Sequence, residues 1–238
     1  ANTHARPVCE RHAMAQTADE GKVVAVLAVG FGLVGFDRFL ISTMFPVIAA
    51  DMGLGYADIG SIAGALSLSW GTAALLCGNL SDRVGRRRVL VGSFLMFSLL
   101  IGASGLATGL SSLIMVRVLL GFADGAFTPA SISATIESSS PEHVGRNIGI
   151  QQMMLTLCGL GISPLAVAAL LHVMDWRWVF SVFVIPALLT AWLTARIIPD
   201  APAGAHNEKQ GPLSDLKLVL SYRNVWIAMM TCCVGSLA

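Results

Sequence analysis

Four ionisable side chains stand inside long apolar runs of this 238-residue sequence: Asp37, Arg38, Arg117 and Asp124. An ionisable group near the centre of a bilayer opposes insertion by roughly 2.5–3.5 kcal/mol unless it faces water or pairs with another group, so such residues are functional candidates. A planar guanidinium stays charged and can bind a carboxylate with two parallel hydrogen bonds. A carboxyl group withdrawn from water can take up and release a proton. These residue types predict an anion receptor made by Arg38 and Arg117, beside two proton carriers, Asp37 and Asp124.

The spacing of these residues places two of them on one helix face. Arg117 and Asp124 are seven residues apart, with Gly121 between them, so all three share a face. We expect Gly121 to leave that face open above the carboxylate. The alternative is structural: Asp37 with Arg38, and Asp124 with Arg117, would neutralise each other or a neighbouring helix and bind no ligand.

Uncharged polar residues in the apolar runs are further candidates. Gln151 and Gln152 stand near the start of a run that begins at about residue 146. One of them is predicted to face a cavity and to bind a hydroxyl or carboxylate group, and Gln151 is our candidate. The alternative is a solvated helix end. Ser67, Ser69 and Trp70 would either line the same pathway or only pack against neighbouring helices.

Membrane-spanning helices are the elements that must hold these groups. Of the residues, 55% are hydrophobic and only 12% are charged, whereas a soluble domain carries about 25% charged residues. A helix needs about 20 apolar residues to cross the hydrocarbon core. The sequence predicts an all-α membrane protein with a tail at 1–22, a six-helix unit at 23–199, a loop at 200–222 and the truncated start of a seventh helix at 223–238. The six spans are expected at 23–50, 56–80, 86–107, 111–136, 146–171 and 176–198.

Basic residues are distributed unequally between the predicted loops. Lysine and arginine on short loops stay on the cytoplasmic side during insertion. The opposite loops hold one arginine, Arg177, beside Asp51, Asp58 and Asp175. Both ends of the six-helix unit, and therefore the N-terminus, are predicted to be cytoplasmic. The basic residues on that side are Arg6, Arg11, Lys22, Arg83, Arg86, Arg87, Arg88, Arg146, Arg196, Lys209, Lys217 and Arg223.

Small, cyclic and aromatic residues mark further features of the spans. The small-xxx-small pairs Gly121 with Gly125, and Gly60 with Gly64, are predicted to let helix backbones approach closely. Trp176 is expected, with Trp178, in an aromatic belt at the membrane interface. Proline removes a backbone hydrogen bond and can bend a helix, and the spans contain Pro46, Pro129, Pro164 and Pro186.

The segment GNLSDRVGRRR, from Gly78 to Arg88, places four arginines and one aspartate between the second and third spans. Its glycines, Gly78 and Gly85, are predicted to form a tight turn. The spacing of the glycines, Asp82 and the basic run resembles the signature loop between helices two and three of the major facilitator superfamily. Three further segments agree: Asp37-Arg38 followed by Pro46 and DMGL, RVLLGFADG at 117–125, and WRWVF at 176–180. Together they resemble the organic anion:proton symporters of that superfamily, which carry sugar acids and related carboxylates.

This resemblance implies the first of two six-helix halves of a secondary transporter in a bacterial inner membrane. It implies a proton gradient as the energy source, no cofactor, and as partners a small organic anion, protons, the lipid bilayer and a C-terminal half. It ties the two arginines to the substrate and the two aspartates to protons, although the family more often has glutamate where this chain has Asp124. A latch on the cytoplasmic side is implied for Gly78, Asp82, Arg83, Gly85, Arg86 and Arg87.

Other classes of function fit the sequence less well. The five histidines show no metal-ligand spacing, and the five cysteines include no CxxC pair. No GxSxG, P-loop or HExxH motif indicates an enzyme, and no basic-aromatic segment indicates nucleic-acid binding. Two alternatives stay open: a proton-linked drug or metabolite antiporter, and a non-transporting membrane sensor or fragment of the same fold. Gly159-x-Gly161-x-x-Pro164 matches only part of the glycine-proline motif of superfamily antiporters, which favours symport.

Overall fold

The computed structural model describes residues 6–198, with the side chains of residues 20–198 except 79, 80, 82 and 83. This part of the chain forms α-helices and one π-helical segment and contains no β-strand. In chain order the elements are α1 (Arg6–Met52), α2 (Tyr56–Val84), α3 (Arg86–Ser104), α4 (Leu110–Ser138), α5 (Val144–Thr156), η1 (Leu157–Ile162), α6 (Ser163–Leu171) and α7 (Trp176–Ile197).

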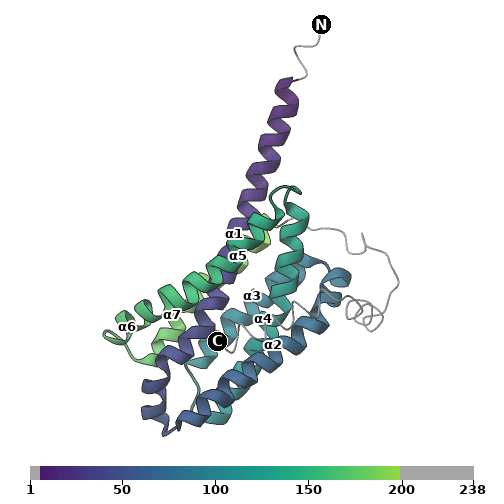
Figure 1. Ribbon diagram of the computed structural model, residues 1–238. Coiled ribbons are helices and arrows are strands. Elements are labelled where there is room, and N and C mark those ends of the chain that lie inside the picture. The colour runs from purple at the N-terminus through teal and green to yellow at the C-terminus, as the bar shows by residue number, and fades with distance from the viewer. Residues whose placement is uncertain (1–5, 199–238) are drawn as a thin grey trace. The chain divides into compact units, whose positions relative to one another are not determined.

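Six segments of the described chain are long and apolar enough to cross a membrane. The predicted all-α membrane fold is confirmed, and each predicted span overlaps one of these segments along nearly its whole length. α1 begins at Arg6, so the predicted tail is helical from that residue and continuous with the first span (Figure 1). The predicted loop at 200–222 and seventh helix at 223–238 lie outside the described residues. The six segments are Glu20–Met52, Tyr56–Gly78, Arg86–Ser104, Leu110–Ser138, Val144–Leu171 and Trp176–Ile197.

The helices pack around α1 and α4 (Figure 1). α5, η1 and α6 lie along α1, α2 lies along α4, and α3 contacts both α4 and α7. Where α1, α3 and α4 meet, three phenylalanine rings stack: Phe127 lies 5.2 Å from Phe31 and 4.7 Å from Phe94, between ring centroids. Aromatic rings at such distances and tilts attract one another beyond their buried area, so this cluster joins three helices in the core.

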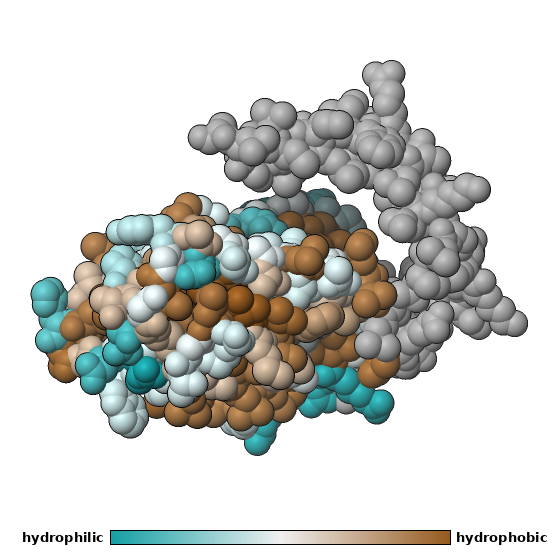
Figure 2. All heavy atoms as spheres, turned by 90° about the horizontal axis from the view of Figure 1, so that it is seen from below, coloured by the Kyte–Doolittle hydropathy of each residue, from teal (hydrophilic) through white to brown (hydrophobic). Residues whose placement is uncertain are grey.

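Many large apolar side chains are exposed, and the face shown in Figure 2 carries brown apolar areas between polar ones. Leu75 on α2, Leu165 on α6 and Ile185 on α7 are among them, each about seven-tenths exposed. Exposed apolar surface of this extent is unfavourable in water and marks contact with lipid or with other protein. The surface agrees with helices that cross a membrane.

The two small-xxx-small pairs behave differently in the structure. A Cβ atom on Gly121 would lie 2.5 Å from the carbonyl oxygen of Leu66, and one on Gly125 would lie 2.5 Å from that of Trp70. The close approach predicted for this pair is confirmed, and it brings α2 against α4. The same approach is not seen at Gly60 and Gly64, because no atom of the described residues lies within 4 Å of a Cβ atom on either residue.

The turn between α2 and α3 is formed by one glycine rather than two. Gly85 has φ of 100° and donates its backbone N–H to Ser81 at 3.1 Å. A positive φ strains residues that have a Cβ atom, which explains glycine at this position. Gly78 lies inside α2, so the prediction that it helps to form the turn is wrong.

The fifth span is not one continuous α-helix. Its middle, Leu157–Ile162, is π-helical, and Pro164 stands at the start of the helix that follows. A Cβ atom on Gly159 would lie 2.8 Å from the carbonyl oxygen of Gly35, and one on Gly35 would lie 2.2 Å from that of Leu155. Glycines on both helices therefore let the π-helical span lie directly against α1. The other spans continue through their prolines, Pro46, Pro129 and Pro186.

Candidate functional site

A buried ion pair joins α1 to α4. Arg117 donates from Nη1 to the Oδ2 atom of Asp37 at 2.8 Å, and the two side chains are 1% and 0% exposed. The structure shows no ion pair of Asp37 with Arg38 or of Asp124 with Arg117 among the described residues. Asp37 is instead neutralised by an arginine of a neighbouring helix, which the structural alternative also allowed. Neighbours along a helix, such as Asp37 and Arg38, do not face each other, which explains why the cross-helix pair forms.

Residues from two more helices enclose this arginine. Its Nη2 atom donates to the hydroxyl of Ser104 on α3 at 3.4 Å, and its guanidinium carbon lies 5.5 Å from the centre of the Phe180 ring on α7. Its Nε and the Oδ1 atom of Asp37 are buried and have no hydrogen-bond partner among the described atoms. Arg117, predicted to bind substrate, is in this conformation turned inward and engaged by Asp37.

Arg38 has a different environment, although it follows Asp37 directly. Its guanidinium carbon lies 4.6 Å above the ring of Trp70 on α2, and the side chain is partly exposed. It forms no ion pair with any residue that the structure describes, and its Nε is buried without a hydrogen-bond partner there. A cation over an aromatic face is attracted by the ring quadrupole, which leaves the charge itself unneutralised.

Trp70 is fixed between two helices. Its indole N–H donates to the hydroxyl of Thr128 on α4 at 3.4 Å, and that hydroxyl donates to the backbone carbonyl of Asp124 at 2.9 Å. Ser69, beside it, is buried against the same helix and donates to the Leu66 carbonyl. The sequence left two options for Trp70, lining the pathway or packing against a neighbouring helix. In the structure Trp70 packs against α4, and its ring also contacts Arg38.

Asp124 is buried on α4 with an exposure of 1%. Both of its carboxylate oxygens lack a hydrogen-bond partner among the described residues. Asp37, Arg38 and Arg117 all lie within electrostatic range of it, so the four predicted residues form one cluster. The expected open face above this carboxylate is wrong, because α2 covers it: a Cβ atom on Gly121 would lie only 1.9 Å from the Ser69 hydroxyl.

Gln151 lies in the contact between α4 and α5. Its side chain is fully buried and donates from Nε2 to the hydroxyl of Thr135, while its Oε1 has no partner among the described atoms. Gln152 is exposed. The alternative of a solvated helix end therefore describes Gln152. Gln151 points inward, and its Oε1 atom accepts no hydrogen bond from the described residues.

The arginines of the signature loop tie its turn to two other helices. Arg86 lies 2.5 Å from a carboxylate oxygen of Glu137 on α4 and donates to the Ser133 carbonyl at 3.0 Å. Arg87 donates to the Ala195 carbonyl near the end of α7. The side chains of Asp82 and Arg83 lie outside the described residues. The loop thus fastens α3 to α4 and α7 at one end of the bundle.

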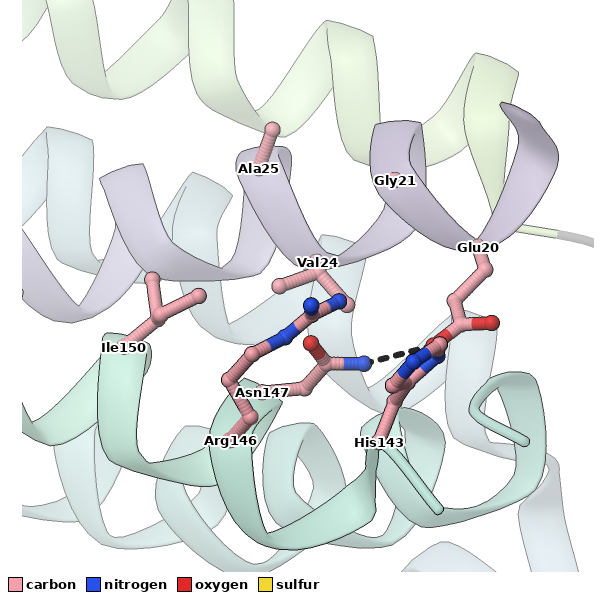
Figure 3. A pocket seen from close by; sticks show the side chains of 8 residues that line it. All are labelled: Glu20, Gly21, Val24, Ala25, His143, Arg146, Asn147 and Ile150. Atoms are coloured by element: carbon pink, nitrogen blue, oxygen red, sulfur yellow. Dashed lines mark hydrogen bonds and ion pairs between the residues drawn. The ribbon is translucent and has the colours of Figure 1, made fainter. Parts of the chain in front are cut away.

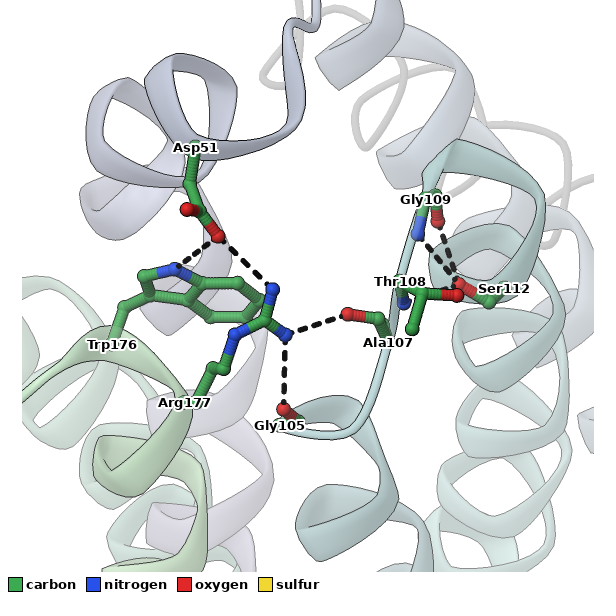
Figure 4. Close-up of polar contacts among 8 residues, drawn as sticks. All are labelled: Asp51, Gly105, Ala107, Thr108, Gly109, Ser112, Trp176 and Arg177. Carbon is green, nitrogen blue, oxygen red and sulfur yellow. Dashed lines mark hydrogen bonds and ion pairs between the residues drawn. The ribbon is translucent and has the colours of Figure 1, made fainter.

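Arg177 connects three segments at the opposite end (Figure 4). It donates to Asp51 at 3.0 Å and to the Ala107 carbonyl at 2.8 Å, and its guanidinium carbon lies 4.3 Å from the Trp176 ring centre. Trp176 is buried and donates its indole N–H to Asp51 at 3.2 Å. The expected belt position is therefore wrong for Trp176, whereas Trp178 is 65% exposed.

A cavity of about 320 Å³ lies between α1 and α5, at the end of the bundle where Arg86 and Arg87 lie (Figure 3). Glu20, buried at its edge, accepts a hydrogen bond from Asn147 at 2.7 Å, and His143 lies 3.7 Å from the same carboxylate oxygen. Our reading of the sequence did not single out Glu20 or Asn147. Polar residues at the ends of apolar runs are the signal that could have identified them. No group of three or more possible metal ligands occurs within the described residues.

Curated relatives that match the chain are membrane transporters. An uncharacterized transporter of Mycobacterium tuberculosis is 30% identical over 76% of this chain and 31% of its own length. A probable L-galactonate transporter of Escherichia coli is 27% identical over 82% and 46%. A multidrug resistance protein B homolog of M. tuberculosis is 29% identical over 72% and 32%. The chain thus spans between 31% and 46% of the length of these relatives.

The fold also matches a solved transporter. A proton:xylose symporter bound to 6-bromo-6-deoxy-D-glucose superposes with a TM-score of 0.68 at 18% identity, over 79% of this chain and 46% of that one. A family model described as Major Facilitator Superfamily matches residues 27–238. Six segments of the described residues are long and apolar enough to cross a membrane, and the chain is an integral membrane protein of the Major Facilitator Superfamily, a family of transporters and not of enzymes.

Proposed function

We propose that the protein is a proton-coupled symporter of a small organic anion that works by alternating access together with a second six-helix half. The observation that supports this most is the charge arrangement of the cluster. Arg38 is the partly exposed cation without an ion pair to any described residue, and it lies near Asp124, a buried carboxyl group without a hydrogen-bond partner there. An unneutralised guanidinium attracts a carboxylate, and an unpartnered buried carboxyl group favours a proton.

The remaining charged pair contributes a conformational element. Arg117 and Asp37 cancel each other's charge in the core, so neither attracts an anion while they stay paired. Protonation of Asp37 would weaken the pair and free the arginine for the substrate. In secondary transporters, substrate and coupling ions bind near the bilayer midplane between two halves that rock against each other. The cluster lies on α1 and α4, within one such half.

The names of two relatives, the probable L-galactonate transporter and a 3-(3-hydroxy-phenyl)propionate transporter of Escherichia coli, support the substrate class. The probable L-galactonate transporter handles a carboxylate, and Arg38 suits the same functional group. The multidrug resistance relative supports a second candidate, antiport of a drug against protons. That function would need a site that tolerates cations or neutral molecules, and Arg38 opposes cations.

Uptake measurements test the proposal. In proteoliposomes that contain the protein in its encoded full length, we expect an inward proton gradient to drive uptake of L-galactonate or another carboxylate, but not export of ethidium. Arg38→Gln should reduce uptake at least tenfold, since it removes the receptor charge. Arg196→Gln is the matched control, because Arg196 also lies over a tryptophan, 5.3 Å from Trp192, but at the end of α7. Equal uptake by Arg38→Gln and the unmodified protein would contradict the proposal.

A further inference from the structure

The position of the Arg38 guanidinium depends on one aromatic contact. Arg38 has a long, flexible side chain, and within the described residues its contact is with the ring of Trp70 at 4.6 Å. An arginine that stacks on a ring keeps the edge of its guanidinium free for two parallel hydrogen bonds to a carboxylate. The ring therefore lies against the guanidinium without accepting a hydrogen bond from it.

Trp70 is itself held by the close contact of α2 with α4. Gly121 and Gly125, one turn apart on α4, lie on either side of its backbone: Cβ atoms there would lie 3.0 Å from the Trp70 nitrogen and 2.5 Å from its carbonyl oxygen. The indole N–H is bound by the Thr128 hydroxyl at 3.4 Å. Both the backbone and the ring of Trp70 are thus positioned by α4.

The same contacts connect the ring to the proton-carrying helix. Thr128 stands four residues after Asp124 and donates to its backbone carbonyl. A shift of α4 near Asp124 would therefore move Thr128 and, through the indole, the ring on which Arg38 lies. The proton site at Asp124 and the anion site at Arg38 would thus be connected through Thr128 and Trp70.

We propose that Trp70 is the positioning residue of this site: its indole holds the Arg38 guanidinium for the substrate carboxylate and connects it to α4 beside Asp124. This inference rests on the proposed function. It assigns a role to a side chain that neither titrates nor carries a charge. Trp70 acts through Arg38, and its loss should change the affinity for the anion more than the maximal rate.

Transport kinetics of four variants test the role. Trp70→Leu removes the ring, and we expect KM for the carboxylate to rise roughly tenfold, with a smaller change in the maximal rate. Trp70→Phe keeps an aromatic face, so KM should rise only a few-fold. Thr128→Val removes the acceptor of the indole N–H and should shift the pH dependence of uptake. Trp192→Leu, on the exposed pair at the end of α7, is the control and should leave KM unchanged.

A double variant separates this role from general packing. If Trp70 acts through Arg38, then Trp70→Leu should add nothing to Arg38→Gln, whereas independent residues would give multiplied effects. An unchanged KM in Trp70→Leu, or multiplied effects in the double variant, would overturn the inference. Loss of uptake in Arg38→Gln with an unaltered KM in Trp70→Leu would leave the proposed function standing. Normal uptake in Arg38→Gln would remove the proposed function as well.

Tryptophan fluorescence gives a second readout if Trp70→Leu fails to fold. Every other tryptophan of the transporting protein, among them the remaining four of this chain, can be changed to phenylalanine so that only Trp70 emits. Addition of L-galactonate should then change the emission of Trp70, and Arg38→Gln should abolish the change. Emission that stays constant in a variant that still transports the anion would contradict the role of the ring.

Discussion

At the scale of single residues, the buried charges of Asp37 and Arg117 matter most, because a charge withdrawn from water must be paired to be stable. The Asp37 and Arg117 side chains are both withdrawn from solvent and joined by one hydrogen bond of 2.8 Å. A buried ion pair is weak support for stability, because desolvation offsets the attraction, but loss of one partner leaves an uncompensated charge. Removal of either partner is therefore expected to cost more stability than the intact pair supplies.

Asp37→Asn should destabilise the fold by about 3–5 kcal/mol, because it leaves Arg117 buried without a counter-charge. The double variant with Arg117→Gln should recover much of the loss, since no unpaired charge remains. The measurement is the thermal unfolding midpoint of the purified protein in detergent. Asp51→Asn, in the half-exposed pair with Arg177, is the control and should change stability by roughly 0–1 kcal/mol.

Asp124→Asn should abolish uptake driven by a proton gradient and preserve exchange of substrate across the membrane. The amide is similar in size and cannot bind the coupled proton, so loaded carriers still reorient but no longer respond to pH. Uptake and counterflow in proteoliposomes distinguish the two activities, with the exposed Asp175→Asn as control. If pH-driven uptake by the Asp124 variant equals that of the unmodified protein, the proton role of this residue is wrong.

At the scale of elements, glycines decide where helix backbones meet. Gly121 and Gly125 bring α2 against α4, and Gly35 and Gly159 bring the π-helical turn of the fifth span against α1. π-helical turns are rare and occur often at functional sites. Here the turn lies in the span that also carries Gln151, whose inward acceptor has no partner among the described atoms. These contacts determine how α2 lies against α4 and how the fifth span lies against α1.

Gly125→Ala should lower the stability of the protein, because its Cβ atom would lie 2.5 Å from the Trp70 carbonyl oxygen. Overpacking of this kind costs roughly 1–3 kcal/mol. Gly64→Ala is a matched control on the other small-xxx-small pair, where nothing lies within 4 Å, and it should not lower the unfolding midpoint. An equal drop in both variants would show that the loss of glycine itself, rather than the α2–α4 contact, is responsible.

At the scale of the whole molecule, two sets of polar contacts fasten opposite ends of the described bundle. Arg86 and Arg87 join the turn after α2 to α4 and α7. Arg177 joins the end of α1, the segment after α3 and the start of α7. A half that moves as one body during alternating access needs its helices fixed at both ends, and these arginines supply such contacts.

The orientation of the protein in the membrane is a separate prediction. We expect Glu142→Cys, between α4 and α5, to face the cytoplasm and Thr108→Cys, between α3 and α4, to face the opposite side. In a background from which all native cysteines have been removed, a membrane-impermeant maleimide added to intact cells should label only the cysteine at position 108. Labelling of the cysteine at position 142 alone would reverse the orientation inferred from the basic loops.

The sequence by itself determined the spans, the family resemblance and the residues of the candidate cluster. Long apolar runs leave few alternatives to membrane helices, because backbone groups in hydrocarbon must be satisfied within the helix. Charges inside such runs are conspicuous for the same reason. Asp37, Arg38, Arg117 and Asp124 could therefore be selected before any contact was known.

Only the tertiary structure decided which of these residues meet. Pairing across helices depends on their rotation and depth, which the sequence does not specify, so Arg117 with Asp37 replaced both local pairings. The same holds for the glycines. Gly60 and Gly121 each begin a small-xxx-small pair, but within the described residues a neighbouring helix lies against Gly121 and not against Gly60. The contact of Arg38 on α1 with Trp70 on α2 exists for the same reason only once both helices lie against α4.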